Sequence, residues 1–254
     1  MKKKKYNNHS KKRIKSKFLY FVTKYPRFKK IYYFYNIYIR NFKFLFNSSQ
    51  FGEDKIITNY FDINYKGNFV DLGCFHPTRH NNTLELYKKG WTGINVDLSP
   101  LTIDLFNFYR NKDININCAV SDKEGITTYY SNGELSPLNT LEKNHLLFLN
   151  KNFNINKHDF EERKIKTKTL SNILKKNKFY YIDFLNIDLE GHEIKIIKNF
   201  NFNLYKIKII CIEVLNHNKT SIKNNKEIQK ILKKNKFILV KKIGVNYFYK
   251  NITF

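Results

Sequence analysis

Apolar runs alternate with helical patterns from about residue 50 to the end of the chain. Short, continuous apolar runs are typical of strands that are covered on both faces. Such strands are expected at 68–73, 92–100, 116–122, 184–191 and 208–214. Between them, apolar positions recur every three to four residues, which predicts helices at 83–89, 101–111, 171–177, 192–200 and 221–235.

The order of these elements predicts an α/β fold, with a mostly parallel sheet and helices on both faces. Near the end of the chain, residues 237–243 and 246–250 flank Gly244 and predict an antiparallel hairpin at one sheet edge. Residues 125–131 and 164–170 are further extended segments. In open parallel sheets, ligands bind beyond the carboxyl ends of the strands. The residues that follow each strand are therefore the candidates for function.

The first part of the chain has a different pattern. Residues 1–17 show no apolar periodicity and are expected to be disordered. Residues 27–46 predict an amphipathic helix whose apolar stripe is Phe28, Ile31, Tyr32, Tyr35, Tyr38, Ile39 and Phe42. This stripe either packs on the following domain or lies in the plane of a membrane. We expect an N-terminal extension over 1–47 and one domain over 48–254.

The charge of the chain is concentrated in this extension. The chain has 47 Lys and Arg against 21 Asp and Glu, a net charge of +26, and no acid precedes Glu53. Dense basic segments bind anionic membranes or nucleic acids. Nucleic acid needs no apolar stripe, so the pattern favours an anionic membrane surface as the partner of residues 1–46. The alternative is that much of the charge belongs to a Lys-rich solvated surface.

The three cysteines, Cys74, Cys118 and Cys211, all lie in apolar runs and form no CxxC pair. They predict buried free thiols in a reducing compartment. No run approaches the ~18 apolar residues of a membrane span. We therefore expect a cytoplasmic protein, with peripheral membrane association through the extension as an open alternative.

Acidic residues mark the first two strand ends. Asp71 and Gly73 lie in FVDLGCFHP, and Asp97 ends the second strand. The turn lacks the GxGxxG pattern that serves pyrophosphate, so a ligand without phosphate fits it better. A carboxylate at the position of Asp97 can accept both hydroxyls of a ribose. Either acid alone could be only a turn or helix cap, but together they favour an adenosyl ligand.

At these residues the sequence resembles the FkbM family of S-adenosylmethionine-dependent methyltransferases. The matching stretches are SQFGEDKII (49–57), FVDLGCFHP (69–77), NNTLELYKKGWTGINVDLSP (81–100), NCAVSDKEG (117–125) and FLNIDLEGHEIKIIK (184–198). The resemblance implies the Rossmann-like class I methyltransferase fold with a seven-stranded sheet. It also implies methyl transfer, often to hydroxyls of sugars or natural products. The chain departs from the family pattern at Cys74, at Asn81 and in its long basic front.

The resemblance also implies a set of residues for S-adenosylmethionine. Asp71, Gly73 and Cys74 would line its methionine side, Asp97 would hold the ribose, and Asn82 would lie in the loop over it. Cys118, Ala119 and Val120 would border the adenine, with Ser121 or Asp122 near its amino group. Gln50, Glu53 and Asp54 would close the site from the N-terminal side. Glu53 and Asp54 could instead be acids that stabilise a helix N-terminus.

Four acidic or titratable residues follow or neighbour the fourth strand: Asp188, Glu190, His192 and Glu213. A hydroxyl that attacks a sulfonium methyl needs a base to take its proton. Asp188 is the first candidate for this base and His192 the second, while Glu213 could converge with Asp188 from the next strand. His192 could also simply begin a helix. These groups could hold a divalent ion, but a metal is not favoured and no metal ligand is assigned.

The sequence therefore predicts an S-adenosylmethionine-dependent methyltransferase that acts on a hydroxyl of a glycan or small molecule. One alternative is an RNA ribose methyltransferase, or an RNA-binding protein, that uses the basic N-terminus. Methylation of bases is disfavoured, because the chain has neither a [DNS]-P-P-[YFW] tetrapeptide nor a Pro-Cys pair. The other alternative is a non-catalytic, membrane-associated binding module.

Overall fold

The computed structural model describes residues 25–216 and 218–254. The chain divides into two units, the first ending at Phe46 and the second running from Asn47 to Phe254. The tail expected over residues 1–17 lies outside the described residues.

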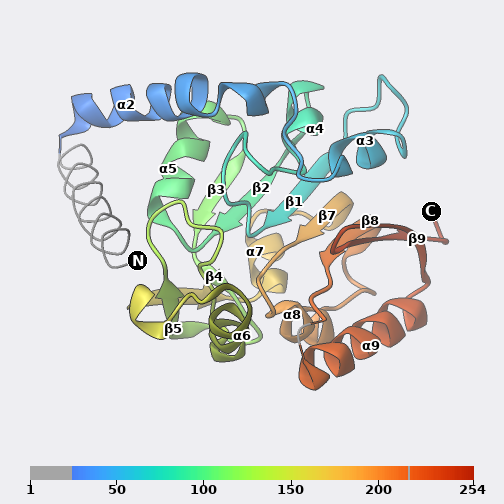
Figure 1. Ribbon diagram of the computed structural model, residues 1–254. Coiled ribbons are helices and arrows are strands. Elements are labelled where there is room, and N and C mark those ends of the chain that lie inside the picture. The colour runs from blue at the N-terminus through green and yellow to red at the C-terminus, as the bar shows by residue number, and fades with distance from the viewer. Residues whose placement is uncertain (1–24, 217) are drawn as a thin grey trace. The chain divides into compact units, whose positions relative to one another are not determined.

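The second unit is built around a seven-stranded sheet with the order β3-β2-β1-β7-β8-β10-β9 (Figure 1). Its strands are β1 (Asn68–Leu72), β2 (Thr92–Asp97), β3 (Ile114–Asn117), β7 (Tyr181–Ile187), β8 (Lys206–Glu213), β9 (Phe237–Ile243) and β10 (Asn246–Asn251). Five of them are parallel, and β10 lies antiparallel between β8 and β9. The expected sheet and closing hairpin are confirmed. Because successive strands add outward from β1 on one side and from β7 on the other, the strand order reverses between β1 and β7.

Helices cover both faces of this sheet, as expected. The helices on one face are α7 (Leu170–Lys176), α8 (Glu193–Asn199) and α9 (Lys219–Lys234). On the other face lie α3 (Glu53–Thr58), α4 (Leu84–Lys88) and α5 (Pro100–Tyr109). Strand alternation divides the core, because Val70 and Leu72 pack in the first cluster and Phe69 packs in the second.

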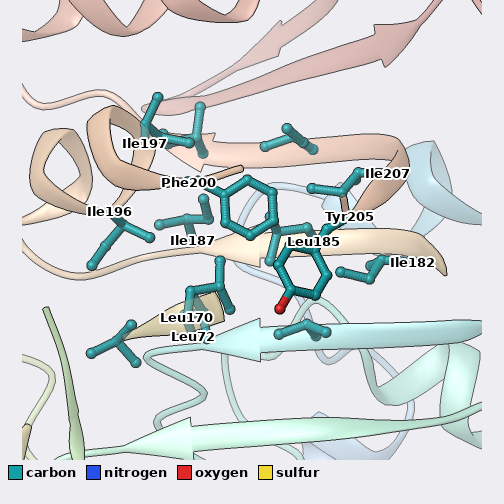
Figure 2. Close-up of a cluster of buried hydrophobic side chains, with 14 of the residues drawn as sticks. Leu72, Leu170, Ile182, Leu185, Ile187, Ile196, Ile197, Phe200, Tyr205 and Ile207 are labelled. Carbon is teal, nitrogen blue, oxygen red and sulfur yellow. The ribbon is translucent and has the colours of Figure 1, made fainter. Parts of the chain in front are cut away.

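The larger cluster lies between α7, α8, α9 and the central strands. Figure 2 shows the rings of Phe200 and Tyr205 side by side among isoleucine and leucine side chains of the sheet. Their ring centroids are 5.4 Å apart. This apolar layer fixes the positions of β7 and β8, and with them the loops that follow these two strands.

The sheet differs from the expected pattern at the third strand. The apolar run over 116–122 is divided, because β3 ends at Asn117 and Ala119–Val120 forms β4 in a separate three-stranded sheet. This second sheet has the order β4-β6-β5, with β5 at Gly125–Ser131 and β6 at Glu161–Lys168. The backbone of β4 pairs with β6, a partner distant in sequence, so the division has no local sequence signal.

A helix that the periodicity did not indicate, α6 (Lys143–Phe153), lies between β5 and β6. It buries only His145, Leu146 and Leu149, too few apolar positions to be recognised as a helical stripe. A short 3₁₀ turn, η3 (Lys157–Asp159), follows it.

The described part of the first unit is helical but not one regular helix. It comprises α2 (Pro26–Phe34), the π-helix η1 (Tyr35–Arg40) and the 3₁₀-helix η2 (Phe42–Leu45). The expected apolar stripe is largely exposed, whereas Tyr33, Ile37 and Asn36 are buried. Whether this stripe packs on the following domain or lies in a membrane stays open, as the sequence left it. Within the described residues, none of the helices combines the length and apolar character needed to cross a bilayer.

Replacing Leu185 with Ala should lower the free energy of unfolding by about 2–5 kcal/mol, because this β7 side chain is fully buried. A matched Leu147→Ala variant removes the same atoms from a side chain that is 68% exposed. It should change the free energy of unfolding by less than about 0.5 kcal/mol. Urea titration followed by circular dichroism measures both values, and equal losses would contradict this assignment of the core.

Candidate active site

A cavity opens at the carboxyl ends of β1, β2, β7 and β8, where the strand order reverses. Most of the expected cofactor residues line it: Gln50, Asp71, Gly73, Cys74, Asn82, Asp97, Cys118 and Val120. So do three of the four candidate catalytic residues, Asp188, Glu190 and Glu213. Ala119, Ser121 and His192 are not among the lining residues. The fold thus brings most of the expected site together, with contributions from both halves of the sheet.

Asp71 is buried, and its carboxylate is surrounded by protein donors. It accepts hydrogen bonds from Asn186 Nδ2 at 2.9 Å, Thr83 Oγ1 at 3.0 Å and Asn81 Nδ2 at 3.3 Å. Burial raises the pKa of Asp71, against the opposing effect of these donors. Because the carboxylate already binds these donors, Asp71 shapes the loop over the cavity.

Arg110, which the sequence analysis did not single out, completes this network. Its Nη1 donates to Thr83 Oγ1 and its Nη2 to Asn81 Oδ1, both at 2.7 Å. The side chain is fully buried, and Nη1 lies 3.9 Å from a carboxylate oxygen of Asp113. In the sequence, the only indication of this role is the position of Arg110 within a run of apolar and aromatic residues. Its positive charge favours the ionised form of Asp71.

Gly73 stands where three strand ends meet. Its φ of 79° lies in the left-handed region, and a Cβ there would overlap the backbone carbonyl oxygen of Asp188. The backbone N–H groups of Gly73 and Cys74 both donate to the Val96 carbonyl, at 2.9 and 3.2 Å. Glycine is therefore required for β1, β2 and β7 to converge.

Asp97 lies at the end of β2 and caps two backbone segments. Its Oδ2 accepts from Phe75 N at 2.9 Å and its Oδ1 from Ser99 N at 2.7 Å. Burial raises the pKa of Asp97 to about 6. Each carboxylate oxygen has a second lone pair, so Asp97 keeps acceptor capacity on its cavity side.

Three carboxyl groups gather at the ends of β7 and β8. Ligand atoms of Asp188, Glu190 and Glu213 all lie within 4.8 Å of one another, a spacing that could accommodate a cation. Glu213 Oε2 is buried and has no hydrogen-bond partner among the described residues. Burial, with repulsion from Glu193 and Asp71, raises the pKa of Asp188 to about 7. Burial and the charge of Asp188 raise the pKa values of Glu190 and Glu213 well above their usual range.

His192 occupies a different environment from the cavity acids. It is buried at the start of α8, with Nδ1 2.7 Å from Glu142 Oε1 and Nε2 3.0 Å from Ser121 Oγ. The hydrogen bond with His192 lowers the pKa of Glu142 to about 2. His192 therefore links α8 to the segment that ends at Glu142 and to the end of β4.

A segment between β5 and α6, residues 132–142, forms the part of the cavity wall that sequence reasoning missed. Ser136, Pro137, Asn139 and Leu141 line the cavity. Glu134 accepts from Ser99 Oγ at 2.6 Å and pairs with Arg163, and Thr140 Oγ1 donates to the Glu190 carbonyl at 3.2 Å. We call this segment the strap, because it is attached to the ends of both β2 and β7.

The residues expected to close the N-terminal side have separate positions. Gln50 lines the cavity. Glu53 is buried and accepts from Phe51 N and Asn246 Nδ2, both at 2.7 Å, and Asp54 accepts from Ser49 Oγ at 2.7 Å. These two acids hold the turn before α3 and lie outside the cavity lining.

Residues 66–239 match the sequence profile described as the methyltransferase FkbM domain. The chain belongs to the FkbM methyltransferase family. This membership accounts for the sheet order and identifies the fold as that of class I methyltransferases. It makes the protein an S-adenosylmethionine-dependent methyltransferase.

Three solved structures resemble this FkbM-family chain at low sequence identity. They are a fibrillarin pre-rRNA processing protein from Methanococcus jannaschii (13% identity, TM-score 0.37, covering 75% of this chain and 68% of that one), an FkbM methyltransferase from Methylobacillus flagellatus KT (11%, 0.42, 72% and 43%) and a TehB-like S-adenosylmethionine-dependent methyltransferase from Corynebacterium glutamicum (10%, 0.41, 84% and 96%). A comparison with curated proteins finds no match.

The cavity has the chemistry that the methyl donor of this FkbM-family protein requires. Gly73 provides a close backbone approach, Asp97 offers acceptors for hydroxyl groups, and Cys118 and Val120 provide an apolar wall. Asp188, Glu190 and Glu213 add carboxyl groups to one part of the cavity, and a positively charged ligand group there would favour their ionised forms. These residues fit a nucleoside that carries a cationic tail.

Arg110→Met should lower the free energy of unfolding by about 3–5 kcal/mol, since it leaves the buried Asp71 charge uncompensated. Asn81 and Thr83 would lose their donors at the same time. Lys112→Met, two residues away at an exposed position, is the matched control and should change the value by less than about 0.5 kcal/mol. Guanidinium titration of both variants measures the difference, and an unchanged Arg110 variant would show that Asp71 is stabilised by other means.

Proposed function

We propose that this methyltransferase transfers a methyl group from S-adenosylmethionine to a hydroxyl of a glycan or small molecule. The observation that carries the proposal is the Asp188–Glu213 carboxyl pair, which lies in the same cavity as Gly73 and Asp97. A carboxyl pair beside the cofactor region supplies a proton acceptor where the acceptor hydroxyl must lie.

In this proposal, Asp97 accepts hydrogen bonds from the ribose hydroxyls. Gly73, Cys74 and Asn82 border the methionine part, and Asp71 acts there by holding the loop that carries Asn82. The adenine lies against Cys118 and Val120, with Ala119 and Ser121 supporting that wall from outside the cavity lining. The support is the position of each residue around one cavity at the end of β1 and β2.

When bound, S-adenosylmethionine supplies a methyl group on a positively charged sulfur. The protein's part is to orient the acceptor hydroxyl in line with that methyl and to take its proton. Asp188 is the proposed proton acceptor. The neighbouring carboxyl groups of Glu213 and Glu190 influence its protonation. His192 is the weaker candidate, because both of its ring nitrogens already contact Ser121 and Glu142.

The strap supports a hydroxyl-rich acceptor. Ser136 and Asn139 bring a hydroxyl and an amide to the cavity wall opposite the strand ends. Such groups can both donate hydrogen bonds to sugar hydroxyls and accept hydrogen bonds from them.

The three cysteines are free and buried, which supports the proposal that the enzyme works in the cytoplasm.

Affinity for S-adenosylhomocysteine should fall as the pH is lowered through about 6, the pKa of Asp97. Protonation removes the charged acceptor, so the affinity is highest above this pH and decreases below it. Asp97→Asn should cost roughly 1.5–3 kcal/mol of binding free energy at pH 8 and should abolish this pH dependence. Calorimetry from pH 5 to 8 measures both effects, with the exposed Asp62→Asn as control. A pH dependence that persists in Asp97→Asn would place the ribose elsewhere.

Asp188→Asn should lower kcat by about 10²–10⁴-fold while S-adenosylhomocysteine binding is kept. The wild-type rate should rise with pH through about 7, because only the ionised carboxylate accepts a proton, and the variant should lack this limb. The exposed Glu124→Gln is the matched control. Transfer of labelled methyl to a panel of sugar nucleotides, glycans and RNA also tests the acceptor class. Turnover that survives in Asp188→Asn but is lost in His192→Ala would reverse the assignment.

A further inference from the structure

The helical segment over residues 25–46 exposes large apolar side chains along much of its length. The exposed residues are Tyr25, Phe28, Ile31, Phe34, Tyr35, Tyr38, Ile39, Phe42 and Phe46. Ile31 and Ile39 are 64% and 60% exposed. An exposed apolar surface of this kind marks a contact surface.

The same segment is strongly basic. Residues 1–46 contain 15 Lys and Arg and no acid. Lys30, Arg40 and Lys43 are exposed within the apolar surface. A partner that matches this surface must therefore be both anionic and able to accept apolar side chains.

The irregular helix keeps polar groups away from this surface. Asn41 Nδ2 donates to the Asn36 carbonyl at 2.8 Å and to Asn36 Oδ1 at 2.9 Å, and both side chains are buried. Asn36 Nδ2 in turn donates to the Tyr32 hydroxyl at 3.1 Å. These amides satisfy one another at the turn between η1 and η2, so the exposed side presents apolar and basic groups.

The chemistry of the exposed residues discriminates between partners. A second copy of the chain would bring two acid-free basic segments together, which charge repulsion opposes. RNA would match the charge and could stack on aromatic rings, but Ile31 and Ile39 offer no ring. Phe34 and Tyr38 also pack on each other, with ring centroids 4.9 Å apart. An anionic bilayer accommodates aliphatic, aromatic and basic side chains at once.

We propose that residues 28–46 form a binding surface for anionic membranes. Ile31, Ile39 and the exposed aromatic rings enter the interface between headgroups and acyl chains. Lys30, Arg40 and Lys43 contact the lipid phosphates. This binding is separate from methyl transfer, so it can be measured without an acceptor, and its failure would leave the proposed reaction standing.

The first test measures co-sedimentation of the full chain with vesicles of mixed phosphatidylglycerol and phosphatidylcholine. Ile31→Ser/Ile39→Ser/Phe42→Ser should reduce partitioning at least about tenfold, because it removes three exposed apolar side chains. The matched control Ile63→Ser/Ile126→Ser/Leu147→Ser removes three apolar side chains of the second unit that are at least as exposed. It should bind as the wild type does, and binding of S-adenosylhomocysteine should be kept in both variants.

The second test separates the charge of the surface from the charge of the whole protein. Lys30→Gln/Arg40→Gln/Lys43→Gln should lose at least about tenfold in partitioning, whereas the exposed control Lys175→Gln/Lys226→Gln/Lys230→Gln, with the same net charge, should lose much less. Equal losses in the two charge variants would overturn the proposal. So would wild-type vesicle binding by the serine variant, or equal binding to pure phosphatidylcholine. RNA binding that is tighter than vesicle binding and insensitive to the serine variant would assign the surface to nucleic acid.

Discussion

The site depends on one buried charge that the protein itself neutralises. Asp71 lies inside the central strand pair of the sheet, where an unpartnered carboxylate would be costly. Donors from Asn81, Thr83 and Asn186 meet it there. Arg110 is fully buried and donates hydrogen bonds to two of these residues, Thr83 and Asn81. The requirement to satisfy Asp71 therefore orders the loop that carries Asn82 over the cavity, and Asn82 donates to Asn186 at 3.1 Å.

The carboxylates at this edge of the sheet fall into two groups with different surroundings. Asp71 has side-chain donors on both oxygens, which suits a structural role. The carboxyl groups of Asp188 and Glu213 lie close together, and one Glu213 oxygen has no hydrogen-bond partner in the part of the chain that the structure describes. Titratable groups with strongly raised pKa values in a cavity are typical of functional sites. The fold thus separates the acid whose oxygens are satisfied by protein donors from the group of acids that retains an unsatisfied oxygen in the cavity.

The strap gives the site its second wall and connects it to the rest of the domain. Its contacts reach Ser99 after β2 and Glu190 after β7. At its end, Glu142 binds His192, whose ring also contacts Ser121. His192, a candidate base by sequence, is in the structure a buried link between the strap, α8 and the end of β4. Ser121 and Glu142 orient the His192 ring, and the position of His192 in the sequence does not reveal these partners.

The sequence by itself determined the elements whose pattern is local. Apolar runs predicted the strands and the closing hairpin. The point where each run stops marks the end of a strand, and this is how the acids and Gly73 were found. The tertiary structure alone decided which of these groups face the cavity. It assigned Arg110 to the site and divided the run at Cys118 between two sheets. Both outcomes depend on partners distant in the chain, namely Arg110 with Asn81 and Ala119 with Thr167. Periodicity reports which side of an element is apolar, but the burial of a polar group is decided by whether a distant donor or acceptor reaches it.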